Sequence, residues 1–181
     1  MRREMIVSAA ANLFRERGYS GTSLDDIGAA VGTTGPAIYR HFPSKEALLT
    51  ELLERAVERA QRDVKSVASQ RLAPRPALEA IVRRSVAHAL EESDLVVMAS
   101  EGVRNLSAST RQRISRGQRV VIEAWVAALR RARPELDREQ ARAIVRGVVA
   151  LAQAVSRSGR VDRAWAEDRF VRMALAALSI D

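Results

Sequence analysis

The stretch from Thr22 to Lys45 constrains the fold of this chain more than any other part of the sequence. It reads TSLDDIGAAVGTTGPAIYRHFPSK and holds two short amphipathic segments around a glycine. Thr22 is the expected N-cap of the first segment, with Asp25 three positions later at the positive end of the helix dipole. Gly32 stands where a left-handed residue would end a helix of about two turns. The apolar positions of this helix share one face: Leu24, Ile27 and Val31.

A second short helix is predicted directly after the glycine turn. Thr34 is its expected cap, and Pro36 is tolerated in the first turn because that amide would have no intrahelical partner. Ile38 and Phe42 form the predicted buried face. Gly28 is small at the point where the two helices must cross, so we expect a tight turn between them.

The outer face of the second helix carries small, polar, aromatic and basic side chains. A short exposed helix of this kind fits the major groove of DNA, with its N-terminal half toward the base edges. Helix pairs around a glycine also occur as plain packing units, so spacing alone leaves both readings open. The outward-facing positions are Thr33, Thr34, Ala37, Tyr39, Arg40 and His41.

The residue identities favour the DNA-binding interpretation. The runs from Gly18 to Gly32 and from Ala37 to Leu49, GYSGTSLDDIGAAVG and AIYRHFPSKEALL, resemble the DNA-binding domain of the tetracycline-repressor (TetR) family. The resemblance covers roughly the first 55 residues and includes apolar positions of a preceding helix. Those positions are Ile6, Ala9, Ala10, Leu13 and Phe14.

The resemblance implies the roles of individual residues. Tyr39 would lie against the sugar-phosphate backbone, Lys45 would pair with a phosphate, and the amide of Thr22 or Ser23 would bind another phosphate. The implied DNA-binding residues are Thr22, Ser23, Thr33, Thr34, Gly35, Pro36, Ala37, Tyr39, Arg40, His41 and Lys45. Gly35, Pro36 and Ala37 depart from the family, since many members carry hydrogen-bonding side chains there. Contact with a thymine methyl and DNA shape would then supply part of the specificity.

The net charge of the chain is not evidence for DNA binding by its N-terminal domain. The chain has a net charge of +8, but residues 1–46 hold six basic and five acidic side chains, a net charge of +1. The excess therefore belongs to residues 47–181. Arg2 and Arg3 remain candidates for a basic arm along the DNA backbone, with a frayed, solvated terminus as the alternative.

Composition predicts an all-α protein. The chain has 181 residues, 47% hydrophobic and only 4% aromatic, without strand alternation. We expect about nine helices in an N-terminal three-helix helix-turn-helix domain (1–46) and a helical effector-binding and dimerisation domain (47–181). The absence of cysteine excludes disulfides and thiolate chemistry. No signal peptide, membrane span, metal motif or cofactor motif is apparent, so we expect a soluble, cytoplasmic protein without cofactor or metal.

Six further helices are predicted after the first domain. Ser44 caps a long helix with apolar positions from Leu49 to Val67, and two prolines interrupt the pattern before residue 76. The later helices are expected at 76–91, 94–106, 110–133, 137–157 and 162–179.

The last two helices are the candidate dimer interface. Their apolar surface is wider than one partner helix needs, and the family resemblance implies a four-helix interface between two copies. Completion of the monomer core is the alternative. A two-fold dimer would hold two recognition helices about one DNA turn apart and require a palindromic operator. The interface residues are Ile144, Val148, Leu151, Ala152, Val155, Phe170, Ala174, Ala177 and Leu178.

The middle helices would hold the effector pocket that the family implies. Its candidate lining residues, for each of which a core position is the alternative, are His88, Met98, Val121, Trp125 and Trp165. Residues 104–133 carry eight arginines against one acid, Glu123. Solvated helix faces explain this, while arginines beside an apolar cavity would suit a hydrophobic or acidic amphiphile such as a fatty acid or an acyl-CoA.

The sequence thus predicts a ligand-responsive DNA-binding regulator, with repression relieved by a small-molecule effector as the family's common pattern. An enzyme is disfavoured because no phosphate loop, nucleophile turn or metal spacing is present. A helical protein-interaction or scaffold module without specific DNA binding is the other alternative.

Overall fold

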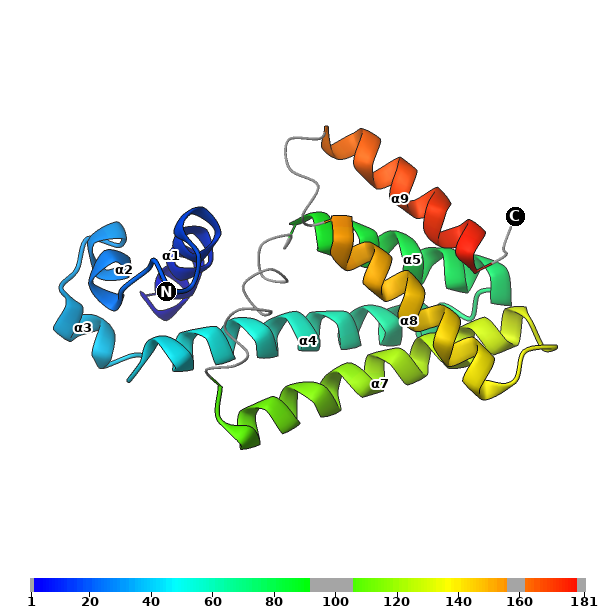
Figure 1. Cartoon of the computed structure of the whole chain (residues 1–181), viewed down its shortest axis with the longest axis horizontal. Coiled ribbons are helices and arrows are strands. Elements are labelled where there is room, and N and C mark those ends of the chain that lie inside the picture. The colour runs from blue at the N-terminus through cyan, green and yellow to red at the C-terminus, as the bar shows by residue number, and fades with distance from the viewer. Residues whose placement is uncertain (1, 92–105, 156–161, 179–181) are drawn as a thin grey trace. The chain divides into compact units, whose positions relative to one another are not determined.

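The protein is entirely helical wherever its structure is described. The computed structural model describes residues 2–91, 106–155 and 162–178, and these contain eight helices and no strand (Figure 1). The expectation of an all-α fold is therefore confirmed. The predicted helix at 94–106 falls almost wholly outside the described residues.

Three short or medium helices precede a long one. Their bounds are α1 (Arg2–Arg17), α2 (Leu24–Ala30), α3 (Gly35–Tyr39) and α4 (Lys45–Ser69). The amide of Ala47 donates to the Ser44 hydroxyl over 3.1 Å, so Ser44 caps α4 as its sequence position predicts. The helix ends before Arg71, whose φ of 51° is left-handed.

The remaining four described helices lie close to their predicted positions. They are α5 (Pro74–Glu91), α7 (Ala108–Ala132), α8 (Arg138–Val155) and α9 (Arg163–Ala177). Two helices start two residues before their predicted positions. Helix α5 begins at Pro74 because proline fits a first helical turn, and α7 begins at Ala108 because the Ser107 hydroxyl accepts from the amide of Thr110.

The chain divides into two compact units. Unit 1 comprises residues up to Ala56 and the described part of the segment that ends at Ile114, and unit 2 comprises the rest. The division falls inside α4 and inside α7, whereas the boundary expected from the sequence was the start of α4 at residue 46. Within unit 1 the amide of Ser107 donates to the Glu46 carboxylate over 2.8 Å, which explains why the start of α7 belongs to this unit.

Each unit has its own apolar core. In unit 1 the largest fully buried side chains come from all four of its N-terminal helices: Ile6, Phe14, Ile27, Ile38, Phe42, Leu48 and Leu49. Each such side chain stabilises the fold by about 1.5–3 kcal/mol through removal of apolar surface from water. The core of unit 2 joins α4, α5, α7, α8 and α9 through Val67, Leu78, Val82, Trp125, Leu129, Val145 and Leu178, among others. No described helix is long and apolar enough to cross a bilayer.

Candidate nucleic-acid interface

Helix α2 is fixed at its N-terminus by a capping box. The Ser23 hydroxyl accepts from the amide of Asp26 over 3.0 Å, and the Asp26 carboxylate accepts from the amide of Ser23 over 2.8 Å. The hydrogen bonds from the Ser23 hydroxyl and amide hold the pKa of Asp26 below its ordinary value. The prediction that Thr22 caps this helix is therefore wrong by one residue.

Thr22 instead connects α1 to the start of α2. Its side chain is buried, and its hydroxyl lies 2.9 Å from the Gly18 carbonyl and 3.2 Å from that of Leu13. The side chain thus faces the interior of unit 1. The amide of Ser23, a candidate phosphate ligand, already donates to Asp26.

The turn between α2 and α3 is tight because two glycines permit it. Gly32 has φ of 65°, a left-handed conformation that glycine adopts without strain. A Cβ on Gly28 would lie 3.2 Å from the Thr33 carbonyl oxygen and 3.3 Å from the Gly35 nitrogen. The predicted close crossing of the two helices is therefore present.

Helix α3 has a buried side and an exposed side. Ile38 is fully buried and Phe42, just after the helix, packs with it in the core. Tyr39 is 54% exposed although it is aromatic, and Arg40 beside it is also exposed. The exposed candidate residues are Ser23, Thr34, Pro36, Tyr39 and Arg40; the half-buried ones are Thr33, Ala37, His41 and Lys45; Thr22 and Gly35 are buried.

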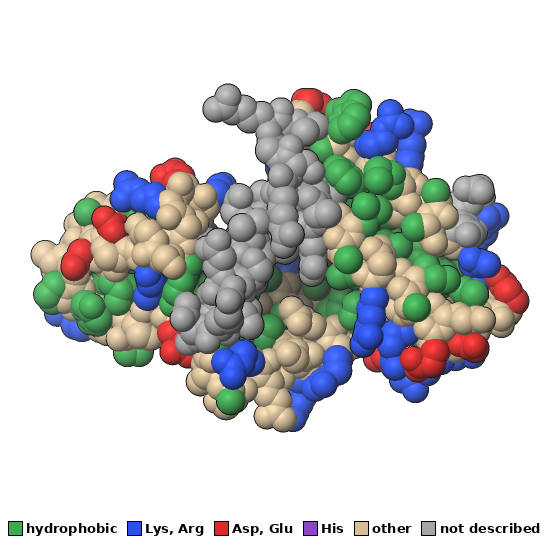
Figure 2. All heavy atoms as spheres, in the orientation of Figure 1, with side chains coloured by type: hydrophobic (Ala, Val, Ile, Leu, Met, Phe, Trp, Pro, Cys, Tyr) green, Lys and Arg blue, Asp and Glu red, His purple; other side chains and the backbone are tan. Residues whose placement is uncertain are grey.

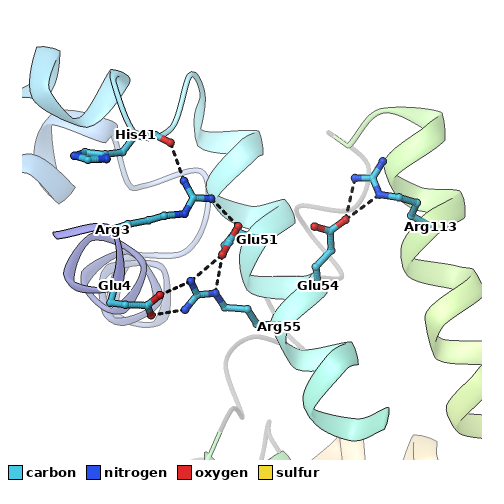
Figure 3. A network of polar contacts seen from close by, with 7 residues as sticks. All are labelled: Arg3, Glu4, His41, Glu51, Glu54, Arg55 and Arg113. Carbon is cyan, nitrogen blue, oxygen red and sulfur yellow. Dashed lines mark hydrogen bonds and ion pairs between the residues drawn. The ribbon is translucent and has the colours of Figure 1, made fainter. Parts of the chain in front are cut away.

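Arg3 holds the end of α3 in place. Its guanidinium donates to the His41 carbonyl over 3.0 Å and to Glu51 of α4 over 2.8 Å, and lies 4.2 Å from the centre of the Phe42 ring (Figure 3). The side chain is thus anchored between α1, the end of α3 and α4. Arg2 and Arg3 lie in α1 rather than in an arm before it, and three partners hold Arg3; a contact of either residue with the DNA backbone stays a prediction.

The same network continues along α1 and α4. Arg55 donates to both oxygens of Glu4 and to Glu51, as Figure 3 shows. The hydrogen bond from Arg55 lowers the pKa of Glu4. Burial alone would raise the pKa of Glu51, but hydrogen bonds from Arg55 and Arg3 outweigh it and hold that pKa below its ordinary value.

Lys45 is directed into unit 1. Its ammonium donates to the carbonyls of Tyr19 and Thr22 over 2.7 and 2.8 Å and lies 4.5 Å from the centre of the Tyr19 ring. Two of its three protons therefore bind the loop that leads into α2. Sequence reasoning assigned Lys45 only to a phosphate, and these contacts give it a structural role as well.

The first residues of α7 also contact α4 within unit 1. Arg113 donates to Glu54 over 2.9 Å (Figure 3), and Ser107 binds Glu46 as described above. These contacts join residues separated by about 60 positions in the sequence. Nothing in the local sequence pattern signals them.

The candidate pocket residues have different surroundings where the structure describes them. Trp125 is buried in the core of unit 2, and Val121 packs against that core. His88 Nδ1 lies 2.9 Å from Asp63 Oδ2 on α4. Trp165 is 53% exposed, with the Arg169 guanidinium over its ring, and Met98 lies outside the described residues.

The arginines of residues 104–133 are dispersed among different partners. Arg113 pairs with Glu54, Arg133 pairs with Glu135, and Arg111 donates to the Leu106 carbonyl. Glu123, the one acid of the segment, binds Arg138 and Arg142 of α8. This arrangement supports the interpretation of solvated, paired helix faces; Arg104 lies outside the described residues.

The predicted dimer residues fall into two groups. Val148, Ala174 and Leu178 are buried by the chain itself, and Ile144 and Phe170 pack against them. Ala177 is exposed and Leu151 is half-buried, while the side chains of Ala152 and Val155 lie outside the described part. Figure 2 shows apolar atoms gathered over the region of α8 and α9. The exposed small or apolar residues there are Ala143, Gly147, Ala150, Ala164, Trp165, Met173, Ala176 and Ala177.

The geometry of α2 and α3 defines the class of the protein. Two short helices cross at a glycine turn, and the second rests on a buried isoleucine while its other side is open to solvent. This is a helix-turn-helix domain, here followed by a helical second unit.

Comparison with known proteins shows what the N-terminal part of the chain is similar to. Residues 6–52 match the model of the bacterial regulatory proteins of the tetR family. The chain is 31% identical to the transcriptional repressor KstR2 of Rhodococcus jostii over 110 residues, which cover 61% of this chain and 54% of the relative. It is 40% identical to the regulator EthR of Mycobacterium tuberculosis over 72 residues, 40% of this chain and 31% of that protein. These alignments span about half or less of the length of the curated relatives.

A solved structure extends the likeness to nearly the whole chain. The TetR-family regulator PfmR of Thermus thermophilus superimposes with a TM-score of 0.82 at 26% identity, over 96% of this chain and 97% of that one. The chain thus matches the tetR family model in its N-terminal domain and has the fold of a TetR-family regulator over nearly its whole length.

Proposed function

We propose that the protein is a DNA-binding transcriptional regulator that reads its operator with α3. The single observation that carries this proposal is the two-sided α3, in which Ile38 is fully buried while Tyr39 and Arg40 are exposed. A helix supported in this way can enter the major groove without disturbing the core beneath it. The match of residues 6–52 to the tetR family model supports the same function.

The proposed contacts with DNA are of two kinds, those with the sugar-phosphate backbone and those with base edges. Tyr39 and Arg40 approach the sugar-phosphate backbone, while Thr33, Thr34, Pro36 and Ala37 approach base edges. The small net charge of residues 1–46 implies that a few placed groups, rather than a broad basic surface, supply the affinity.

We propose further that the protein acts as a homodimer on a palindromic operator. The exposed apolar and small side chains of α8 and α9 support this arrangement, because such a surface is unfavourable in water unless covered. A two-fold dimer would present two copies of α3 to successive turns of the groove.

We propose that unit 2 binds a small-molecule effector that relieves repression. The effector would be a hydrophobic compound or an acidic amphiphile. An effector changes DNA affinity only as far as it prefers one conformation of the dimer over the other. Each unit has its own apolar core, which supports effector binding by one part of the chain and DNA binding by the other.

Substitution of Tyr39 tests the proposal. DNA fragments are first selected from the genome of the source organism with the purified full-length protein. Tyr39→Ala is expected to weaken binding to a selected fragment by about 1–3 kcal/mol, which is roughly 5–150-fold. Met5→Ala, which changes another exposed hydrophobic residue of unit 1, serves as the matched control. Equal affinity of the wild type and the Tyr39 variant would contradict the assignment, and failure to select any fragment would favour a scaffold function.

A further inference from the structure

The first residue of α3 is covered by a carboxylate from α2. A Cβ built on Gly35 would lie 1.8 Å from Asp25 Oδ1 and 3.1 Å from its Cγ. The Asp25 carboxylate thus occupies the space into which a side chain at position 35 would project. Gly35 is buried, although its neighbours Thr34 and Pro36 are exposed.

The Asp25 carboxylate is open to solvent and uncommitted. Its residue is exposed, and within the described chain no hydrogen bond or ion pair engages it. Asp26, the next residue, is instead used in the capping box with Ser23. The two adjacent acids therefore differ: Asp26 stabilises the start of α2, and the carboxylate of Asp25 lies over Gly35, the first residue of α3. Favourable interaction with the α2 dipole is the contribution that Asp25 makes to stability.

The chemistry of this position complements the rest of α3. The first turn of the helix offers Gly35, Pro36 and Ala37, which have no side-chain hydrogen-bonding group. A carboxylate is an acceptor only. In the major groove the matching donors are the exocyclic amino groups, N4 of cytosine and N6 of adenine.

We propose that Asp25 is a specificity residue that accepts a hydrogen bond from an exocyclic amino group in the major groove. This inference rests on the proposed function, because it requires α3 to lie in the groove. The negative charge of Asp25 also weakens binding to DNA that presents no amino group at this position, because phosphates repel an unpaired carboxylate. Asp25 therefore lowers affinity for random DNA while it supports binding to the operator.

Three variants separate the charge of Asp25 from its position. Asp25→Ala removes the acceptor, and Asp25→Asn removes the charge but keeps the size of the side chain. Gly35→Ala keeps the charge but displaces the carboxylate, which sits at the end of a side chain and is able to shift. Glu58→Gln, which removes an exposed acid of α4 outside unit 1, is the matched control.

The measurement is the ratio of affinities for a selected duplex and a random duplex of the same length. We expect Asp25→Ala to lower this ratio by about 5–150-fold, the discrimination expected of one base contact, with tighter binding to random DNA. Gly35→Ala should lower the ratio in the same direction, and Glu58→Gln should leave it unchanged. Selection from a randomised duplex library should yield a cytosine or adenine in each half-site for the wild type and any base there for Asp25→Ala, which also identifies the donor.

Two results would overturn the inference. One is a change of both affinities by the same factor, as expected if Asp25 acts only on helix stability or by general repulsion. The other is an identical selected motif for the wild type and Asp25→Ala. If the wild type itself shows no preference for any duplex, the proposed function fails together with this inference; if it has a preference that Asp25→Ala retains, only this inference fails.

Discussion

At the scale of single residues, long-range contacts determine which of two equally good candidates caps a helix. Thr22 and Ser23 are both good N-caps, and each has an aspartate three positions later. The structure selects Ser23, because the Thr22 hydroxyl is buried against the carbonyls of Leu13 and Gly18. Such a choice depends on how α1 packs and was not predictable from the α2 sequence.

Lys45 likewise makes contacts that the local sequence does not predict. The family resemblance implied a phosphate contact, whereas the structure adds two hydrogen bonds to the carbonyls of Tyr19 and Thr22. Loss of the ammonium group would leave these two carbonyls without a charged donor, at a total cost of about 1–3 kcal/mol.

We expect Lys45→Met to lower the free energy of unfolding by about 1–3 kcal/mol, because it keeps the alkyl stem but removes the ammonium group. Urea denaturation of the wild type and variant measures this difference. Lys65→Met, at an exposed position of α4, should have little effect and serves as the control. Unchanged stability with weakened DNA binding would mean that Lys45 serves the phosphate alone.

At the scale of elements, periodicity predicts the helices well, while their ends depend on caps. The apolar spacing of α4, α5, α7, α8 and α9 is visible in the sequence, and all five appear within a few residues of their expected bounds. The contacts that tie α1 to α4 were not predicted, because Arg3 and Glu51 are 48 positions apart. Charge pairs of that separation have no local signature.

The ion network between α1 and α4 predicts acid sensitivity of unit 1. The folded protein holds the pKa of Glu4 and of Glu51 below their ordinary values, so it binds fewer protons than the unfolded chain. Their stabilising contribution is therefore complete above about pH 4.5 and is lost as the pH falls below that value.

We expect the melting temperature to fall between pH 6 and pH 3, and Glu51→Gln to reduce both the melting temperature at pH 6 and the size of this fall. Thermal unfolding followed by circular dichroism at several pH values measures both quantities. Glu16→Gln, an exposed position of α1, is the control. A pH dependence that is identical in the wild type and Glu51→Gln would contradict the role of the network.

At the scale of the whole molecule, the outer surface of α8 and α9 is the proposed dimer interface. The sequence predicted an apolar face there, but it did not separate the side chains that fill the monomer core, such as Val148 and Leu178, from exposed ones such as Ala150 and Met173. Both groups recur at helical spacing, so periodicity cannot distinguish them.

We expect the wild type to have the mass of a dimer at micromolar concentration, and Ala150→Glu to have the mass of a monomer. The new carboxylate would be buried without a partner in the dimer and solvated in the monomer. Light scattering coupled to gel filtration measures the mass, and Ala68→Glu, at an exposed position of α4, should leave it unchanged. A monomeric wild type would contradict the proposed assembly and with it the palindromic operator.

The central claim is that this chain binds a particular DNA sequence through α3. The most direct test compares the affinity of the full-length protein for a genome-selected duplex and for a random duplex at several salt concentrations. We predict affinity for the selected duplex at least about 1,000-fold higher, and a steep fall of both affinities with added salt as phosphate contacts release counterions. Equal affinity for the two duplexes, or affinity that does not fall with salt, would contradict the account.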